Sequence, residues 1–173
     1  QFYLGVMYDN GEGVAHNARQ AAKWYRQAAE QGLAAAQANL GVLYEQGKGV
    51  AQDYRAAARW YRQAAGQGDV DGQFNLGNLY YEGKGIKQDY QAARQWFERA
   101  AAQGDAGGQN NLAYLYWQGL GVEKNIPLAK QLFEQSAAQD HALAKSNLGM
   151  MYWQGIDGKK DIVLAKSWLE QAA

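Results

Sequence analysis

The chain has 173 residues, and its 17 lysine and arginine residues are matched by 17 aspartate and glutamate residues, so that its net charge is zero. A neutral chain lacks the strongly basic surface that is typical of a nucleic-acid-binding protein, and it has no basic segment that would hold it on an anionic membrane. With no cysteine, only two histidines and no apolar run near the ~20 residues of a spanning helix, the composition argues against disulfides, thiolate metal sites and direct membrane insertion.

Four residue types recur along the chain at a constant spacing of 36 positions. A period of this length indicates a solenoid of stacked supersecondary units. The columns are Leu4, Leu40, Leu76, Leu112 and Leu148; Tyr8, Tyr44, Tyr80, Tyr116 and Tyr152; Gly11, Gly47, Gly83, Gly119 and Gly155; and Ala21, Ala57, Ala93, Ala129 and Ala165. We therefore predict a single array, with repeats at about 1–32, 33–68, 69–104, 105–140 and 141–173.

The first predicted element of each repeat is a helix with one apolar face. In the first copy Leu4, Met7 and Tyr8 lie at positions i, i+3 and i+4 of the helical period. A glycine pair that begins at Gly11 follows, and glycine accepts the left-handed conformation that commonly ends a helix. In the last copy Asp157 replaces the second glycine, so that this loop is expected to differ in shape.

A second helix follows the glycine loop in every copy. It is preceded by a short polar residue that suits an N-cap position. These residues are Asn17, Asp53, Asp89, Asn125 and Asp161. In the first copy Ala21 and Tyr25 share one helical face, and Gly32 ends the helix. Asp69 and Asp105 are predicted to cap the first helices that come next. Each repeat is thus a predicted helix–loop–helix unit.

Small residues predict close contact between helices. Glycine inside a helix costs roughly 1 kcal/mol relative to alanine, so its recurrence indicates that a neighbouring helix packs on the bare backbone. The column of small residues in the middle of the first helices is Gly5, Gly41, Gly77, Ala113 and Gly149. The alanine columns of the second helices are the expected partner surface. A further column is expected to pack between repeats rather than to contact a ligand: Trp24, Trp60, Trp96, Leu132 and Trp168.

These patterns resemble a Sel1-like repeat. The resemblance is carried by the segment 40–50 and by the residues that follow it in the same repeat, namely Asp53, Ala57, Trp60, Tyr61, Ala64, Ala65, Gln67, Gly68 and Asp69. Sel1-like repeats are related to tetratricopeptide repeats. The resemblance implies an all-α, right-handed α/α superhelical solenoid whose first helices line the concave side. It also implies a scaffold or adaptor role, most often in the bacterial envelope or in secreted proteins.

Sequence motifs for catalysis or for a cofactor are missing. Some bacterial proteins with such repeats carry a disulfide in each repeat and are associated with β-lactam binding or hydrolysis, but this chain has no cysteine. The Gly-x-Gly loops lack the preceding strand and third glycine of a dinucleotide fingerprint. His16 and His141 stand in different columns, and no serine is followed three residues later by lysine. We therefore predict no catalytic residue, no cofactor and no metal site.

One face of the predicted first helices changes character along the chain. It points away from the leucine and tyrosine columns, and in the last three repeats it combines large apolar residues with amides, a composition that is typical of an interaction hot spot. The predicted partner-binding residues of this concave groove are Phe74, Asn78, Tyr81, Glu82, Asn110, Tyr114, Trp117, Gln118, Met150, Trp153 and Gln154. An alternative interpretation places Tyr81, Trp117 and Trp153 under the glycine loops as packing.

Three functional hypotheses follow. The leading one is a non-enzymatic scaffold that binds a partner protein or peptide in the groove, without nucleic acid or membrane insertion. The second is an envelope protein that binds or hydrolyses β-lactams or peptidoglycan fragments, and the third is a structural assembly module. The chain looks like a segment of a longer protein. Its last helix is therefore expected to expose an apolar surface for self-association, formed by Trp168, Leu169, Ala172 and Ala173.

Overall fold

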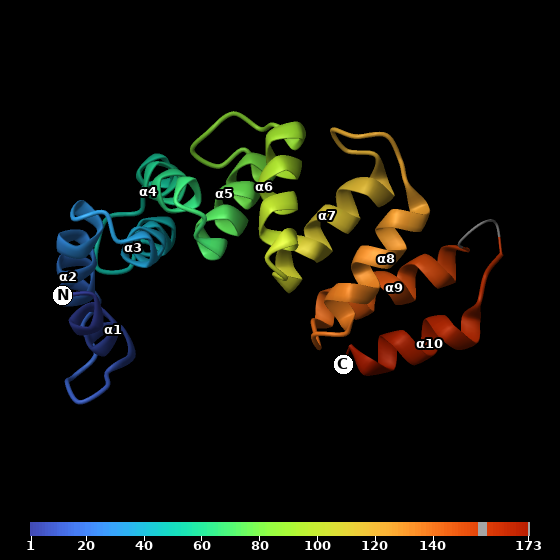
Figure 1. Ribbon diagram of the computed structural model, residues 1–173. Coiled ribbons are helices and arrows are strands. Elements are labelled where there is room, and N and C mark those ends of the chain that lie inside the picture. The colour runs from blue at the N-terminus through green and yellow to red at the C-terminus, as the bar shows by residue number, and fades with distance from the viewer. Residues whose placement is uncertain (156–158, 173) are drawn as a thin grey trace. The chain divides into compact units, whose positions relative to one another are not determined.

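Helices make up the whole of the secondary structure described here. The computed structural model describes residues 1–155 and 159–172, among which no strand occurs (Figure 1). The helices are α1 (Phe2–Asn10), α2 (Ala18–Glu30), α3 (Ala34–Gln46), α4 (Tyr54–Gly66), α5 (Val70–Glu82), α6 (Tyr90–Ala102), α7 (Ala106–Gln118), α8 (Ile126–Ala137), α9 (Ala142–Gln154) and α10 (Ile162–Gln171). Odd-numbered helices are the first and even-numbered helices the second of each repeat. The all-α, two-helix repeat predicted from the sequence is confirmed.

The loop glycines end the first helices as predicted. The residues after α1, α3, α5 and α7 adopt a left-handed conformation, with φ of +75°, +69°, +72° and +73°. Gly155, after α9, differs with φ +97° and ψ +99°. The expected change of loop shape at Asp157 lies outside the described residues.

Polar side chains begin most helices. The side chains of Asn17, Asp53, Asn125 and Asp161 each accept a hydrogen bond from a backbone N–H in the first turn of a second helix. Those of Asp69 and Asp105 do the same for α5 and α7. Asp89 lies directly before Tyr90, the first residue of α6. Because these caps satisfy N–H groups that a helix cannot pair internally, they explain where the helices start.

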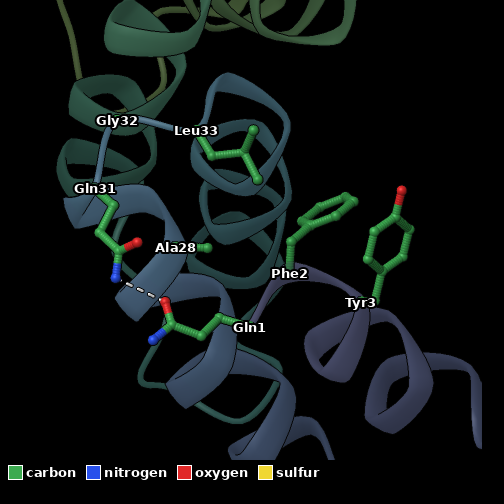
Figure 2. Close-up of a pocket in the computed structure, with 7 residues that line it drawn as sticks. All are labelled: Gln1, Phe2, Tyr3, Ala28, Gln31, Gly32 and Leu33. Carbon is green, nitrogen blue, oxygen red and sulfur yellow. Dashed lines mark hydrogen bonds between the residues drawn. The ribbon is translucent and has the colours of Figure 1, made fainter.

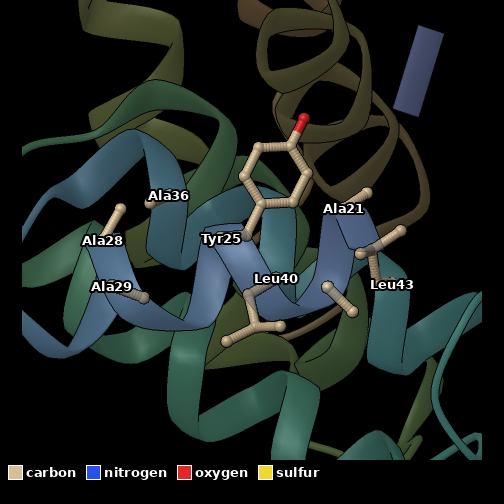
Figure 3. Close-up of a cluster of buried hydrophobic side chains, with 8 residues drawn as sticks. Ala21, Tyr25, Ala28, Ala29, Ala36, Leu40 and Leu43 are labelled. Carbon is tan, nitrogen blue, oxygen red and sulfur yellow. The ribbon is translucent and has the colours of Figure 1, made fainter. Parts of the chain in front are cut away.

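The chain divides into two compact units, 1–89 and 90–173. Unit 1 holds α1 to α5 and unit 2 holds α6 to α10. In unit 1, Tyr25 is buried together with small residues of α2 and leucines of α3 (Figure 3). Trp60 packs against this cluster, which also contains leucines of its own repeat. Packing of the tryptophan column between repeats stays a prediction.

In the first two repeats the mid-helix glycines face aromatic rings, not the alanine columns. A Cβ atom on Gly41 would lie 2.5 Å from Cε1 of Tyr61, and one on Gly5 would lie 2.5 Å from Cδ1 of Tyr25. The expectation of an alanine surface is therefore wrong for Gly5 and Gly41, whereas Gly149 lies against Leu169 and the backbone of Ala165, a residue of an alanine column. A helical position carries no information on which residue faces it, and here the second helix presents its largest buried side chain. Alanine does meet glycine at a different position, where Gly72 lies against Ala64.

Glutamine pairs join the start of a first helix to the end of the second helix in the same repeat. Gln31 donates a hydrogen bond of 2.8 Å to Gln1 (Figure 2), and Gln67 donates one of 2.8 Å to Gln37. The buried Gln37 side chain also donates to the carbonyl of Ala29 in the preceding repeat, at 3.1 Å. The Gln37 amide is thus satisfied where water reaches it poorly, whereas Gln1 and Gln31 are exposed.

Neighbouring repeats also meet through backbone atoms. A Cβ atom on Gly49 would lie 2.1 Å from the carbonyl oxygen of Ala18 at the start of α2. Equivalent contacts occur between Gly85 and Tyr54 in unit 1 and between Gly121 and Tyr90 in unit 2. The second glycine of the loop is thus required by the approach of one repeat to the next.

Candidate protein-interaction surface

The predicted partner-binding residues lie on α5, α7 and α9. Those on α5 belong to unit 1, where Phe74, Asn78 and Tyr81 are half-buried and Glu82 is exposed. Those on α7 and α9 belong to unit 2 and form a set of their own.

An asparagine pair joins α7 to α9. The side chain of Asn147 donates a hydrogen bond of 2.9 Å to Oδ1 of Asn110, whose own amide donates to Asn111 at 3.0 Å. Asn110 is only 4% exposed. Its polar atoms are therefore engaged inside unit 2, where they hold the two first helices together. Asparagines also recur at 36-residue spacing at positions 39, 75, 111 and 147, a signal that the sequence analysis missed.

Tyr114 and Met150 occupy equivalent positions on α7 and α9. Tyr114 is half-buried, whereas 38% of Met150 is exposed. Gln118 and Gln154 lie one helical turn further along and are both exposed. We call these four residues the first-helix stripe. It combines apolar and amide groups on one side of unit 2.

The tryptophans differ from this stripe. The ring of Trp117 meets the ring of Phe133 on α8 edge to face, with centroids 5.9 Å apart, and that of Tyr114 with centroids 6.2 Å apart. Phe133 is fully buried. Trp117 thus contributes to packing between the two helices of its repeat. Trp153 is 52% exposed and lines a cleft of about 570 Å³ together with Ala165 and Leu169.

The first two repeats have a carboxylate at the position equivalent to Trp117. In the second repeat the Tyr61 hydroxyl donates to Glu45 at 2.6 Å, and in the first the Tyr25 hydroxyl reaches Asp9 at 3.4 Å. Burial, and then the neighbouring carboxylate, raise the pKa of Tyr25 to about 12. The same causes raise the pKa of Tyr61. The signal for this pairing is a constant offset of 16 residues, which was not considered in the sequence analysis.

The last helix exposes apolar side chains. Leu169 is 41% exposed, although its equivalents in the other repeats are nearly or fully buried: Tyr25, Tyr61, Phe97 and Phe133. Ile162 and Val163 are also exposed, which the sequence analysis did not predict. Trp168 and Ala172 are half-buried, and Ala173 lies outside the described residues. Self-association through this surface stays a prediction.

In the described part of the chain, the side chains that could bind a metal ion do not form such a site, and one of the two histidines caps a helix. Among residues 1–155 and 159–172 there is no group of three or more histidine, aspartate or glutamate side chains arranged to hold a metal ion. Nδ1 of His141 accepts a hydrogen bond of 3.3 Å from the Ala144 N–H and so caps α9. None of the described helices combines the length and hydropathy that crossing a bilayer requires.

The repeated helix pairs define an α-solenoid protein. The Sel1 repeat family matches at residues 1–33, 34–69, 70–105, 106–141 and 142–173, which together span the chain. The chain therefore belongs to the Sel1 repeat family. Proteins of this family are in general scaffolds for protein interaction. No curated protein matches the chain.

Three solved structures are similar to this chain. A protective antigen of uropathogenic Escherichia coli is 41% identical with a TM-score of 0.88, over 99% of this chain and 37% of the antigen. A Sel1 repeat protein from Oxalobacter formigenes is 38% identical with a TM-score of 0.87, over 98% of this chain and 69% of the other. A Klebsiella pneumoniae protein described as a Sel1 repeat protein is 28% identical with a TM-score of 0.70, over 87% and 72%. The chain thus spans little more than a third of the first of these structures.

Proposed function

We propose that the chain is a non-enzymatic scaffold that binds a segment of a partner protein on the exposed side of its first helices. The observation that carries the proposal is the first-helix stripe of unit 2. Tyr114 and Met150 stand at equivalent positions on α7 and α9, and the Asn147–Asn110 hydrogen bond holds these helices side by side. A pair of apolar side chains on a fixed spacing offers anchor points for a partner.

Amides beside the two anchors supply the polar contacts. Gln118 and Gln154 are exposed, and each side-chain amide has both a donor and an acceptor for the backbone of an extended segment. Neither charge nor a reactive group lies in the stripe. Binding is therefore short-ranged and depends weakly on salt. In unit 1, Phe74 and Asn78 on α5 form the corresponding part of the surface, flanked by Tyr81 and Glu82.

The test selects peptides from a random library on the immobilised chain and measures their affinity for variants. Tyr114→Ala and Met150→Ala are expected to weaken binding at least about tenfold each, in the range of hot-spot residues. Leu143→Ala is the control, because Leu143 is 64% exposed on the same helix as Met150 but outside the stripe. Peptides that bind all three variants equally, or a library that yields no binder, would contradict the proposal.

The envelope-enzyme alternative makes a different prediction. A β-lactam or peptidoglycan fragment would bind to the chain without competition from the selected peptides, and its binding would not respond to Tyr114→Ala. Isothermal titration with these compounds separates the two functions. The structure offers no observation that favours this alternative over the scaffold.

A further inference from the structure

Charge is sorted between the two helix layers of unit 1. The first helices α1, α3 and α5 are described in full and contain no lysine or arginine, but they carry Asp9, Glu45, Asp71 and Glu82. The second helices α2 and α4 carry Arg19, Lys23, Arg26, Arg55, Arg59 and Arg62, with Glu30 as their only acid. Although the net charge of the chain is zero, the first helices of unit 1 are therefore acidic and its second helices α2 and α4 are basic.

Four of these cations form two rows, one on α2 and one on α4. Arg19 and Lys23 are one turn apart on α2, and Arg55 and Arg59 are one turn apart on α4, each pair spanning about 6 Å along its helix. All four side chains are exposed, and no carboxylate of the described residues lies within ion-pair distance of them. We call these four residues the basic ridge.

The loop between α3 and α4 brings the starts of α2 and α4 to one edge of unit 1. Gly49 touches the backbone of Ala18 and Arg19 at the start of α2, and the same loop leads directly into α4 at Tyr54. Lys48, next to Gly49, is exposed and adds a further cation at this edge. Arg26 and Arg62 do not belong to the ridge. Their guanidinium groups donate hydrogen bonds to the hydroxyls of tyrosines in the next repeat.

The fold does not require cations at the ridge positions. In the last three repeats the position of Arg19 and Arg55 is taken by Gln91, Pro127 and Val163, and that of Lys23 and Arg59 by Gln95, Gln131 and Ser167. Helices α6, α8 and α10 form with these uncharged residues. The four cations therefore occur only in the first two repeats, and neither helix formation nor packing explains their presence.

We propose that the basic ridge binds an acidic polypeptide segment whose carboxylates repeat one helical turn apart. Two rows of cations at that spacing match glutamates at i and i+4 on a partner helix. The large hydrophobic side chains exposed in unit 1 are Tyr3, Leu4 and Leu33, all outside the ridge, so the contact is hydrophilic. A long polyanion is disfavoured because unit 1 holds as many acidic as basic residues and its other layer is acidic.

The experiment measures the fluorescence anisotropy of a labelled helical peptide with glutamate at every fourth position. The ridge variant replaces Arg19, Lys23, Arg55 and Arg59 by glutamine, a residue that α6 carries at both positions. The control replaces Lys124, Lys159, Lys160 and Lys166, four exposed lysines of unit 2, by glutamine and so has the same net charge. Circular dichroism verifies that both variants stay helical.

The unchanged chain is expected to bind the peptide at low salt and to lose affinity as salt rises, because exposed ion pairs are screened. The affinity of the ridge variant for the peptide is expected to be about tenfold lower than that of the unchanged chain. The control is expected to bind the peptide like the unchanged chain. No binding, or an equal loss in both variants, overturns the proposal. Tighter ridge-dependent binding of a DNA duplex or of phosphatidylserine vesicles than of the peptide overturns the assignment of the partner. Tyr114→Ala is expected to leave binding of the glutamate peptide unchanged, which distinguishes the ridge from the proposed first-helix surface.

Discussion

The hydroxyl of Tyr61 on α4 donates a hydrogen bond of 2.6 Å to Glu45 on α3. The ring of Tyr61 lies over Gly41 of the same first helix, so one side chain provides both a packing contact and a polar contact. In the fourth repeat the equivalent residues are Phe133 and Trp117, which meet as two rings. The two positions change together, from a phenol and a carboxylate to two aromatic groups.

The tyrosine–carboxylate pairs predict a loss of stability at alkaline pH. The folded state keeps the Tyr25 proton up to a pKa of about 12, whereas the unfolded chain releases it near 10. This contribution to the free energy of unfolding is therefore fully present below pH 10 and is lost as the pH rises toward 12. Urea denaturation at about pH 9 and about pH 11 measures the difference. Tyr25→Phe combined with Tyr61→Phe should reduce it, and Tyr3→Phe, at an 80% exposed position, should not.

Gly41→Ala should destabilise the chain despite the better helix propensity of alanine. The added methyl group would lie 2.5 Å from the fully buried ring of Tyr61. We expect a loss of about 1–3 kcal/mol in the free energy of unfolding. Gly66→Ala is the matched control, because nothing lies within 4 Å of its added methyl group and a neutral to stabilising effect is expected. Equal effects of both substitutions would contradict the close contact.

The two tryptophans should respond differently to truncation. Trp117→Ala removes the edge-to-face contact with Phe133 and should lower the free energy of unfolding by about 2–4 kcal/mol. Trp153→Ala should cost less than about 1 kcal/mol, because half of this side chain is exposed. Thermal and chemical denaturation of the two variants decide between packing and surface roles. A small change in the free energy of unfolding for Trp117→Ala would contradict the packing role and would favour a place for Trp117 on the partner-binding surface.

Asp140 occupies a position where the earlier repeats have glycine. Its φ is +64°, and Gly32, Gly68 and Gly104 at the equivalent positions also have positive φ. Asp140→Gly should raise the melting temperature by about 2–4 °C, because glycine adopts this conformation without strain. The ion pair with Lys145 would be lost, but Asp140 is exposed and such pairs contribute little. Asp140→Ala should lower the melting temperature, and a rise in both variants would rule out backbone strain as the cause.

The helices and their ends followed from the sequence, but the partners across helices did not. The 36-residue columns predicted both helices of each repeat, the left-handed glycines and caps such as Asn17 and Asp105. A column defines a position on its own helix and says nothing of what faces it. For this reason the ring opposite Gly41 and the bond from Asn147 to Asn110 became visible only in the structure.

The predicted interaction surface shows the same limit. Tyr114 and Trp117 are three residues apart and were assigned to one surface, because a helical wheel alone places both away from the leucine column. The structure turns Trp117 toward α8, while Met150 and the glutamines remain exposed. Trp117 packs on the ring of Phe133, where the next repeat has Leu169, and a helical wheel of one helix does not show such a contact between two helices.

The contact of Gly49 with the Ala18 backbone has an evolutionary consequence. Because successive repeats meet there through main-chain atoms, this one contact does not depend on which side chains the two repeats carry, provided that the glycine is kept. A gene that duplicates, deletes or recombines such repeats retains this contact each time. Binding residues on the open faces are then free to diverge from copy to copy, as the replacement of Arg19 and Arg55 by uncharged residues in later copies illustrates.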